Sequence, residues 1–173
     1  MSLSEADRPS RMDRDAFVKR FEGVFEHSPW IPGQAWDRGL GPDADTAEGV
    51  HARMCAVLGD AGEERQLELI RAHPDLAGKL AQAKGLTEES TREQASARLD
   101  QLTAGELARF TELNDAYRVR FGFPFVIAVR GLTKDDILAA FERRLGNDAG
   151  TERHTALEQI MRIALLRLRE LLP

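Results

Sequence analysis

The sequence predicts an all-α fold, a single-domain helical bundle of about seven to nine helices. Apolar residues recur at helical spacing through most of the 173 residues, and no sustained alternation of β-branched residues competes with that pattern. Hydrophobic residues make up 42% of the chain, which is enough for one compact core at this length. We therefore expect one helical domain over residues 13–173, preceded by a polar, disordered tail over residues 1–12.

Capping residues and helix breakers mark the first three helices. Asp13 is placed to cap a helix that ends near residues 27–29, and a short helix or turn follows. Thr46 is placed to cap another helix, which ends where Gly59 and Gly62 interrupt the apolar pattern. These signals place three helical segments before a fourth, which begins at residue 63.

His73 lies at a junction between two expected helices. The fourth helix spans residues 63–72 and must end there, because Pro74 disfavours an α conformation in the residue before it. We expect Pro74 to open the next helix, which would make His73 its N-cap. The positive end of that helix dipole would disfavour the imidazolium, so one hypothesis is a neutral, proton-exchanging histidine. The alternative is a simple capping hydrogen bond.

Further helices follow in the second half of the chain. Three of them begin at a threonine that can accept hydrogen bonds from the first helical turn: Thr87, Thr103 and Thr133. Gly122 is well placed to end the long helix that begins after residue 103, and residues 147–150 form a turn before the last helix. The segment 123–129 has the composition of a strand, but a lone strand has nothing to pair with. We therefore expect it to be a buried connector.

Charge and cysteine content exclude several classes of partner. The chain carries 24 Lys and Arg against 29 Asp and Glu, and this net charge of −5 argues against binding to nucleic acid. The one cysteine, Cys55, cannot form an intramolecular disulfide or a cysteine-rich zinc site. No segment has the length and apolarity of a membrane span, and no signal peptide is recognisable. We expect a soluble, cytoplasmic protein with no metal site and no membrane partner.

The other polar candidates have plainer interpretations. Ser90 and Glu93 would share one face of a helix and could meet a ligand together, but Ser-x-x-Glu is also a capping box that needs no ligand. Arg162 and Arg167 lie beside apolar positions of the last helix, and either could reach inward as a fork for a carboxylate. Most such arginines are solvated. No metal-ligand or phosphate-binding motif occurs.

Four motifs follow one another along the chain. They are His73-Pro74-Asp75-Leu76-Ala77-Gly78, Leu86-Thr87-Glu88-Glu89-Ser90-Thr91-Arg92-Glu93-Gln94, Leu113-Asn114-Asp115-Ala116-Tyr117-Arg118 and Arg120-Phe121-Gly122-Phe123-Pro124-Phe125-Val126-Ile127. Together they resemble the OHCU decarboxylases, which act on 2-oxo-4-hydroxy-4-carboxy-5-ureidoimidazoline, the last intermediate between urate and (S)-allantoin. The resemblance runs from Phe17 to Leu168. It implies an all-α homodimer that catalyses the third step of urate catabolism.

The resemblance also implies a role for each matching residue. His73 falls on the catalytic proton donor and Glu93 on the second catalytic group. The expected substrate-binding residues are Pro74, Ser90, Thr91, Arg92, Glu93, Gln94, Phe125, Val126, Ile127, Ala128, Val129 and Arg167. No cofactor is expected, because the C=N bond of the substrate can itself accept the electron pair left by CO₂.

Two alternative interpretations stay open at this point. The chain could be a non-catalytic helical binding module, in which His73 and the pair Ser90 and Glu93 are only caps, or a hydrolase that acts on a related ureide. Release of CO₂ from freshly made substrate separates a decarboxylase from both. The sequence ends Leu171-Leu172-Pro173, without a Ser-Lys-Leu peroxisomal signal, which agrees with the expected cytoplasmic location.

Overall fold

The structure is a computed structural model, and it describes residues 4–77 and 86–173. Within these ranges there are eight α-helices and no strand, which confirms the predicted class and helix number. Backbone contacts divide the chain into two compact units. Unit 1 comprises Met1–Leu69 with Met161–Pro173, and unit 2 comprises Ile70–Ile160. No helix in the described ranges is both long and apolar enough to cross a membrane.

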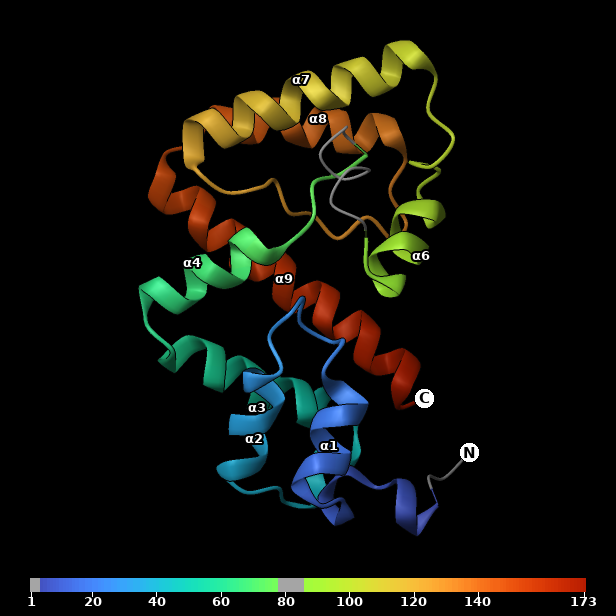
Figure 1. Ribbon diagram of the computed structural model, residues 1–173, viewed down its shortest axis with the longest axis vertical. Helices are drawn as coiled ribbons and strands as arrows, with labels where there is room; N and C mark the ends of the chain where they lie inside the picture. Colours follow the sequence, from blue (N-terminus) through green and yellow to red (C-terminus); the bar gives the residue numbers. More distant parts are fainter. Residues whose placement is uncertain (1–3, 78–85) are drawn as a thin grey trace. The chain divides into compact units, whose positions relative to one another are not determined.

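Unit 1 is built on the predicted start signals. Its helices are α1 (Arg14–Phe21), α2 (Trp30–Asp37), α3 (Ala47–Asp60), most of α4 (Glu63–Ala72) and the last part of α9 (Ala149–Leu171), as Figure 1 shows. The caps Asp13 and Thr46 accept the expected backbone hydrogen bonds from the first turns of α1 and α3. Helix α1 ends at Phe21, earlier than predicted, because the N–H of Val24 donates to the carbonyl oxygen of Phe21, three residues back, in a turn tighter than that of an α-helix.

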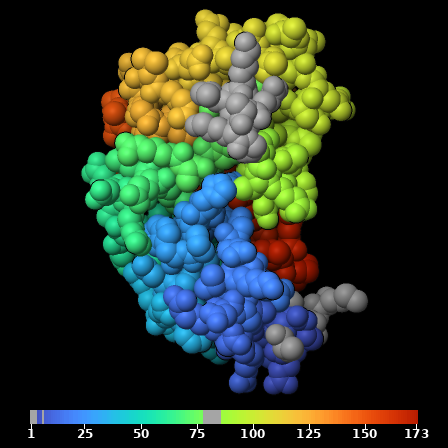
Figure 2. Space-filling model, viewed as in Figure 1, coloured from blue at the N-terminus to red at the C-terminus, as the bar shows by residue number. Residues whose placement is uncertain are grey.

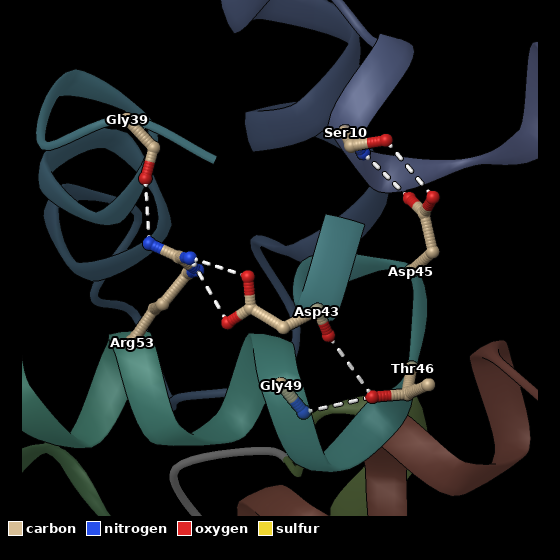
Figure 3. Close-up of polar contacts among 7 residues, drawn as sticks. All are labelled: Ser10, Gly39, Asp43, Asp45, Thr46, Gly49 and Arg53. Carbon is tan, nitrogen blue, oxygen red and sulfur yellow. Dashed lines mark hydrogen bonds and ion pairs between the residues drawn. The ribbon is translucent and has the colours of Figure 1, made fainter. Parts of the chain in front are cut away.

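Residues 4–12, within the expected tail, fold as two short 3-10 helices, η1 (Glu5–Asp7) and η2 (Pro9–Arg11). Asp45, in the 3-10 helix η3 (Pro42–Asp45), accepts two hydrogen bonds of 2.9 Å from the backbone N–H and the hydroxyl of Ser10 (Figure 3). The indole N–H of Trp36 donates to the carbonyl oxygen of Met12 at 3.1 Å. This part of the chain therefore makes specific contacts with the helices of unit 1.

The first turn of α3 contains a glycine that no other residue can replace. Arg53 donates to both carboxylate oxygens of Asp43, at 2.7 and 2.9 Å, and to the carbonyl oxygen of Gly39 at 2.7 Å (Figure 3). The Thr46 hydroxyl donates to the Asp43 carbonyl oxygen and accepts from the N–H of Gly49. A β carbon on Gly49 would lie 1.6 Å from that carbonyl oxygen, so only glycine fits.

Unit 2 also begins its helices where the sequence predicts. It contains α6 (Glu88–Ser96), α7 (Ala104–Phe121), α8 (Lys134–Leu145) and the first part of α9. Thr87 caps α6, and Thr103 and Thr133 form complete capping boxes on α7 and α8. Gly122 ends α7 with a left-handed backbone, φ 75°. Helices α7 and α8 lie side by side and form one wall of this unit (Figure 1).

The prediction that a helix opens at Pro74 is wrong for the residues that the structure describes. Residues 74–77 are not helical, and Ala77 has a left-handed backbone, φ 47°, which no α-helix contains. His73 is therefore not the N-cap of a helix opened at Pro74. The remainder of that predicted helix, residues 78–85, lies outside the described residues.

Candidate active site

His73 is a buried residue directly after the end of α4. It belongs to unit 2 and is only 6% exposed. Its backbone N–H donates to the carbonyl oxygen of Ile70 at 3.2 Å, which closes the last turn of the helix. On the other side Pro74 has a fixed φ, so few torsions separate His73 from the residues that follow. We call residues 73–77 the histidine loop.

Side chains from α6 and α7 hold the backbone of the histidine loop. The Gln94 amide accepts from the N–H of Ala77 at 3.1 Å and donates to the carbonyl oxygen of Asp75 at 3.3 Å. The Asn114 amide donates to the carbonyl oxygen of Leu76 at 2.6 Å. Three consecutive residues of the loop are therefore bound by two side-chain amides, and neither amide comes from a neighbouring part of the sequence.

The acidic residue of the histidine loop, Asp75, is buried. The Asp75 side chain is fully buried and accepts a hydrogen bond from Nε of Arg118 at 2.9 Å, in an ion pair. A buried carboxylate is costly unless it is paired, so Arg118 compensates its charge. Arg118 lies one helical turn after Asn114 on α7, and both side chains therefore reach the loop from one face of that helix.

The segment Ser90–Gln94 occupies the first turns of α6. Thr87, not Ser90, caps this helix, since its hydroxyl accepts from the N–H of Ser90 at 3.2 Å. The capping-box interpretation of Ser90 and Glu93 is therefore wrong, and both residues lie inside the helix. Ser90 and Gln94 are buried and Glu93 is half-buried. Thr91 and Arg92 are exposed, on a helix that forms part of the surface of unit 2 (Figure 2).

The connector, residues 123–129, is buried as predicted and carries the last group of expected site residues. All of its residues are buried except Ile127, which is half-buried. Phe125 stacks on Phe141 of α8, with ring centroids 3.7 Å apart. The N–H of Ala128 donates to the side-chain carbonyl oxygen of Gln159 at 3.0 Å. The connector is therefore held to α8 and α9 without being a strand.

A buried cluster of charged and polar side chains anchors the connector. Arg144 donates from Nη1 to the carbonyl oxygen of Val126 at 2.7 Å and from Nε to Glu152 at 2.6 Å, and its guanidinium lies over the Phe125 ring. Glu152 is fully buried and also accepts hydrogen bonds from the Tyr117 hydroxyl and the Asn147 amide. Burial and the hydrogen bond to Glu152 raise the pKa of Tyr117, so it stays a neutral donor.

Helix α7 brings the histidine loop and the connector to one scaffold. Asn114 holds Leu76 of the loop, and Tyr117, three residues later, packs against Phe125 of the connector with ring centroids 5.2 Å apart. Residues three apart on a helix share a face and are separated by about 4.5 Å along its axis. The structure therefore gathers His73, the buried positions of 90–94 and the connector within unit 2.

Arg167 belongs to unit 1 and is bound there. It is 4% exposed and donates to Glu26 at 3.0 Å and to the carbonyl oxygens of Gly23 and Val24 at 3.1 and 3.4 Å. Glu26 is itself buried in the turn after α1. These contacts give Arg167 a structural role in that turn, and its expected contact with substrate stays a prediction.

Sequence reasoning missed the residues that hold the site segments, although a signal for them exists. Asn114 lies at helical spacing between Phe110 and Tyr117, and Arg144 follows Phe141 on the apolar face of α8. A polar residue on an apolar stripe is expected to be buried and hydrogen-bonded. The stripe itself could therefore have marked both residues, but not their partners.

A surface pocket of unit 2 lies apart from the predicted site residues. The pocket has a volume of about 500 Å³ and contains none of the predicted site residues. It is lined by Ser96, Ala97, Arg98, Gln101, Leu132, Thr133, Lys134 and Asp135. Among the described residues, no group of three or more His, Cys, Asp or Glu side chains is placed to hold a metal ion.

Comparison with known proteins gives one consistent family. Residues 10–169 match the family model described as OHCU decarboxylase. A protein of Haloferax volcanii named 2-oxo-4-hydroxy-4-carboxy-5-ureidoimidazoline decarboxylase is 44% identical over 161 residues, which cover 93% of this chain and 92% of that protein. A protein of the same name from Amia calva is 37% identical over 158 residues, covering 91% and 89% of the two chains.

Two solved structures share the fold of this chain. A crystal structure of (S)-allantoin synthase superposes with a TM-score of 0.74 and 30% identity, over 94% of this chain and 52% of that chain, so this chain spans about half of its length. A crystal structure of an OHCU decarboxylase in the presence of (S)-allantoin gives a TM-score of 0.68 at 24% identity, over 86% and 94% of the chains, and supports the fold.

Proposed function

Because the chain belongs to the OHCU decarboxylase family, we propose that it removes CO₂ from 2-oxo-4-hydroxy-4-carboxy-5-ureidoimidazoline and forms (S)-allantoin, the third step of urate degradation. The observation that carries this proposal is the family match over residues 10–169. The relative from Haloferax volcanii, which has nearly the same length, supports it. The proposal is also supported by the three expected site segments, around His73, Ser90 and Phe125, which all belong to unit 2. Arg167 belongs to unit 1.

The substrate can supply the electron sink for this reaction. The bond between the ring carbon and its carboxylate breaks, and the electron pair forms a double bond to the neighbouring carbon. The pair of the adjacent C=N bond moves to nitrogen, which takes a proton, and an enol results. A proton delivered to one face of the neighbouring carbon, with loss of the hydroxyl proton, gives the ketone of allantoin. One CO₂ leaves and one proton is consumed.

His73 and Glu93 carry the proposed proton transfers and orientation. His73 is one residue of a loop that is fixed on both sides, which suits a group that must hand a proton to one face of a planar intermediate. We assign the ureido group or the ring to Glu93, which lies half-buried one turn after the buried Ser90. Ser90 and backbone groups of residues 125–129 would bind the amides of the ring and the ureido group.

A coupled assay tests this function directly. Urate oxidase and hydroxyisourate hydrolase generate the unstable substrate, and CO₂ release and the circular dichroism of (S)-allantoin are followed. His73→Asn should lower turnover by about 10²–10⁴-fold, the usual size of general acid–base help. Glu93→Gln should also lower turnover while the protein stays folded, because Thr87 and not Glu93 caps the helix.

His154→Asn is the matched control for the His73 variant. His154 is an exposed histidine of α9 that faces Glu158, so its replacement should leave turnover unchanged. Normal turnover in a folded His73→Asn protein would contradict the assignment of His73. Formation of a product without CO₂ release would instead favour a hydrolase.

We further propose a homodimer that works in the cytoplasm, as the family resemblance implies. Light scattering on the purified protein should give twice the chain mass of 19.3 kDa. A mass of one chain at micromolar concentration would contradict the dimer. Fractionation of the source cells should place the activity with cytoplasmic markers.

A further inference from the structure

The histidine loop is held in a conformation that its own sequence does not favour. Ala77 has φ 47°, in the left-handed region where a β carbon clashes with the backbone. Such a conformation persists only when surrounding contacts impose it. The N–H of this same residue donates to the Gln94 side chain, so one of the imposing contacts is identified.

Gln94 acts on the loop as a neighbouring peptide group would. Its side-chain oxygen accepts from the N–H of Ala77, and its side-chain nitrogen donates to the carbonyl oxygen of Asp75. An extended segment next to a strand is bound by the same pair of groups. The Gln94 amide therefore fixes the direction of the chain across Leu76, and it is 6% exposed.

Asn114 completes this arrangement from α7. Its N–H donates to the carbonyl oxygen of Leu76, between the two groups that Gln94 binds. Asp75 is held in turn by Arg118, one turn further along α7. Because Pro74 restricts the chain between Asp75 and His73, fixing Asp75 and Leu76 also limits where the His73 imidazole can lie. We call Gln94 and Asn114, with Arg118, the loop clamp.

We propose that Gln94 and Asn114 are positioning residues for His73, which act on it through the backbone of the histidine loop. This inference rests on the proposed function, in which His73 transfers the proton. A displacement of about 1 Å in a reacting group can cost roughly 10²-fold in rate. The loop clamp is therefore expected to matter for turnover far more than for substrate binding.

The first test replaces Asn114 by the similarly sized leucine. Asn114→Leu should lower kcat by about 10²-fold, and KM should stay within about threefold of wild type. Thr111→Val is the matched control, because Thr111 lies on the same helix and its hydroxyl donates to the carbonyl oxygen of Leu107, away from the loop. Thr111→Val should leave kcat and KM unchanged.

The second test needs no substrate, so it also holds if the proposed reaction is wrong. Histidine labelled with ¹³C gives ring signals from only four residues, His27, His51, His73 and His154, and His73→Asn identifies the third. Asn114→Leu should shift the His73 signals and leave the other three in place. Gln94→Met should do the same and provides a second variant if Asn114→Leu does not fold.

Three outcomes would overturn the inference. One is a folded Asn114→Leu or Gln94→Met protein with unmoved His73 signals. Another is a rise in KM of tenfold or more with kcat unchanged in Gln94→Met, which would make Gln94 a substrate-binding residue. The last is an equal loss of kcat in Thr111→Val, which would show that any lost bond on α7 is sufficient. If the wild-type protein releases no CO₂ but the His73 signals shift as expected, the proposed function fails and the clamp stands.

Discussion

The histidine loop and the connector are both irregular and both buried, yet their backbone carbonyl groups are bound by side chains of different charge. The loop backbone is bound by the neutral amides of Gln94 and Asn114. The connector backbone is bound by the charged Arg144, whose partner Glu152 also accepts hydrogen bonds from Tyr117 and Asn147. A neutral hydrogen bond contributes about 1 kcal/mol, whereas breaking a buried ion pair costs about 3–5 kcal/mol.

Because of this difference, we expect loss of a loop contact to affect turnover and loss of the connector's charged contact to affect stability. Loss of one neutral amide leaves the core intact and lets a short loop move, so the expected effect is on turnover. Loss of Arg144 or Glu152 leaves a charge buried among α7, α8 and α9, so the expected effect is on the free energy of unfolding. Variants of the residues that hold the loop and of those that hold the connector test this expected difference.

The largest effect is expected at the charged anchor. Arg144→Met should lower the free energy of unfolding by about 3–5 kcal/mol, because Glu152 keeps its charge in a fully buried position. Urea unfolding followed by circular dichroism measures this loss. The double variant Arg144→Met with Glu152→Gln removes both charges and keeps an acceptor for Tyr117, so it should be more stable than Arg144→Met alone. A loss below about 1 kcal/mol in Arg144→Met would contradict the expected stabilising role of the charged contact.

A somewhat smaller effect is expected at Arg167, which binds a buried glutamate and loop carbonyls as Arg144 does. Lysine keeps the charge but replaces a planar fork with a point donor, so Arg167→Lys should lower stability by about 1.5–3 kcal/mol. Thermal melts measure this change. Calorimetric titration with (S)-allantoin is the second measurement. Weaker binding by an Arg167→Lys protein that remains folded would assign a substrate contact to Arg167.

The neutral bond to the connector should have a modest effect. Gln159→Leu removes the acceptor of the Ala128 N–H and should cost about 1–3 kcal/mol in stability. Because Arg144 still holds the neighbouring carbonyl of Val126, kcat should stay within about threefold of wild type. A 10²-fold loss of kcat in a stable Gln159→Leu protein would show that the connector, too, is positioned by neutral bonds.

The strained residue of the histidine loop should show almost no net change in stability. Ala77→Gly removes about 1–2 kcal/mol of left-handed strain, and glycine adds about 0.4–1 kcal/mol of chain entropy to the unfolded state. The two terms nearly offset each other, so the melting temperature should stay the same or rise slightly. A clear fall in melting temperature would mean that the Ala77 methyl group makes packing contacts that outweigh the strain.

The smallest effect of the clamp variants is expected on the reactivity of Cys55. This residue lies in unit 1 and serves as a reference outside the loop and the connector. Burial raises the pKa of the Cys55 thiol to about 11, so the reactive thiolate is scarce at pH 7. Alkylation should accelerate about tenfold per pH unit until this pKa is reached. Because the unfolded thiol ionises near 9, its contribution to stability is present below pH 9 and is lost as pH rises toward 11. Clamp variants should leave the alkylation rate unchanged.

Helix starts could be read from the sequence because their signals are local. The caps Asp13, Thr46, Thr87, Thr103 and Thr133 each accept from a backbone N–H three residues later. The histidine loop could not be read in this way. Its conformation depends on Gln94 and Asn114, and the latter is 38 residues from Leu76 in sequence. From local signals alone, a new helix was therefore expected to open at Pro74.

Only part of the candidate site could be predicted from the sequence. The resemblance to the OHCU decarboxylases identified the segments around His73, Ser90 and Phe125, and all three belong to unit 2. The residues that hold those segments were not identified, because Asn114 and Arg144 act through contacts between helices that no sequence window contains.

Gly49 has a consequence for how tolerance to substitution should be interpreted in this protein. The carbonyl oxygen of Asp43 occupies the space where any side chain would begin. In a saturation scan every replacement at Gly49 should be depleted as strongly as replacements of His73, although Gly49 has no part in any reaction. Strict retention of this glycine among relatives would therefore record the close approach of the Asp43 carbonyl to the first turn of α3. Retention of Asn114, by contrast, would record a requirement of the chemistry.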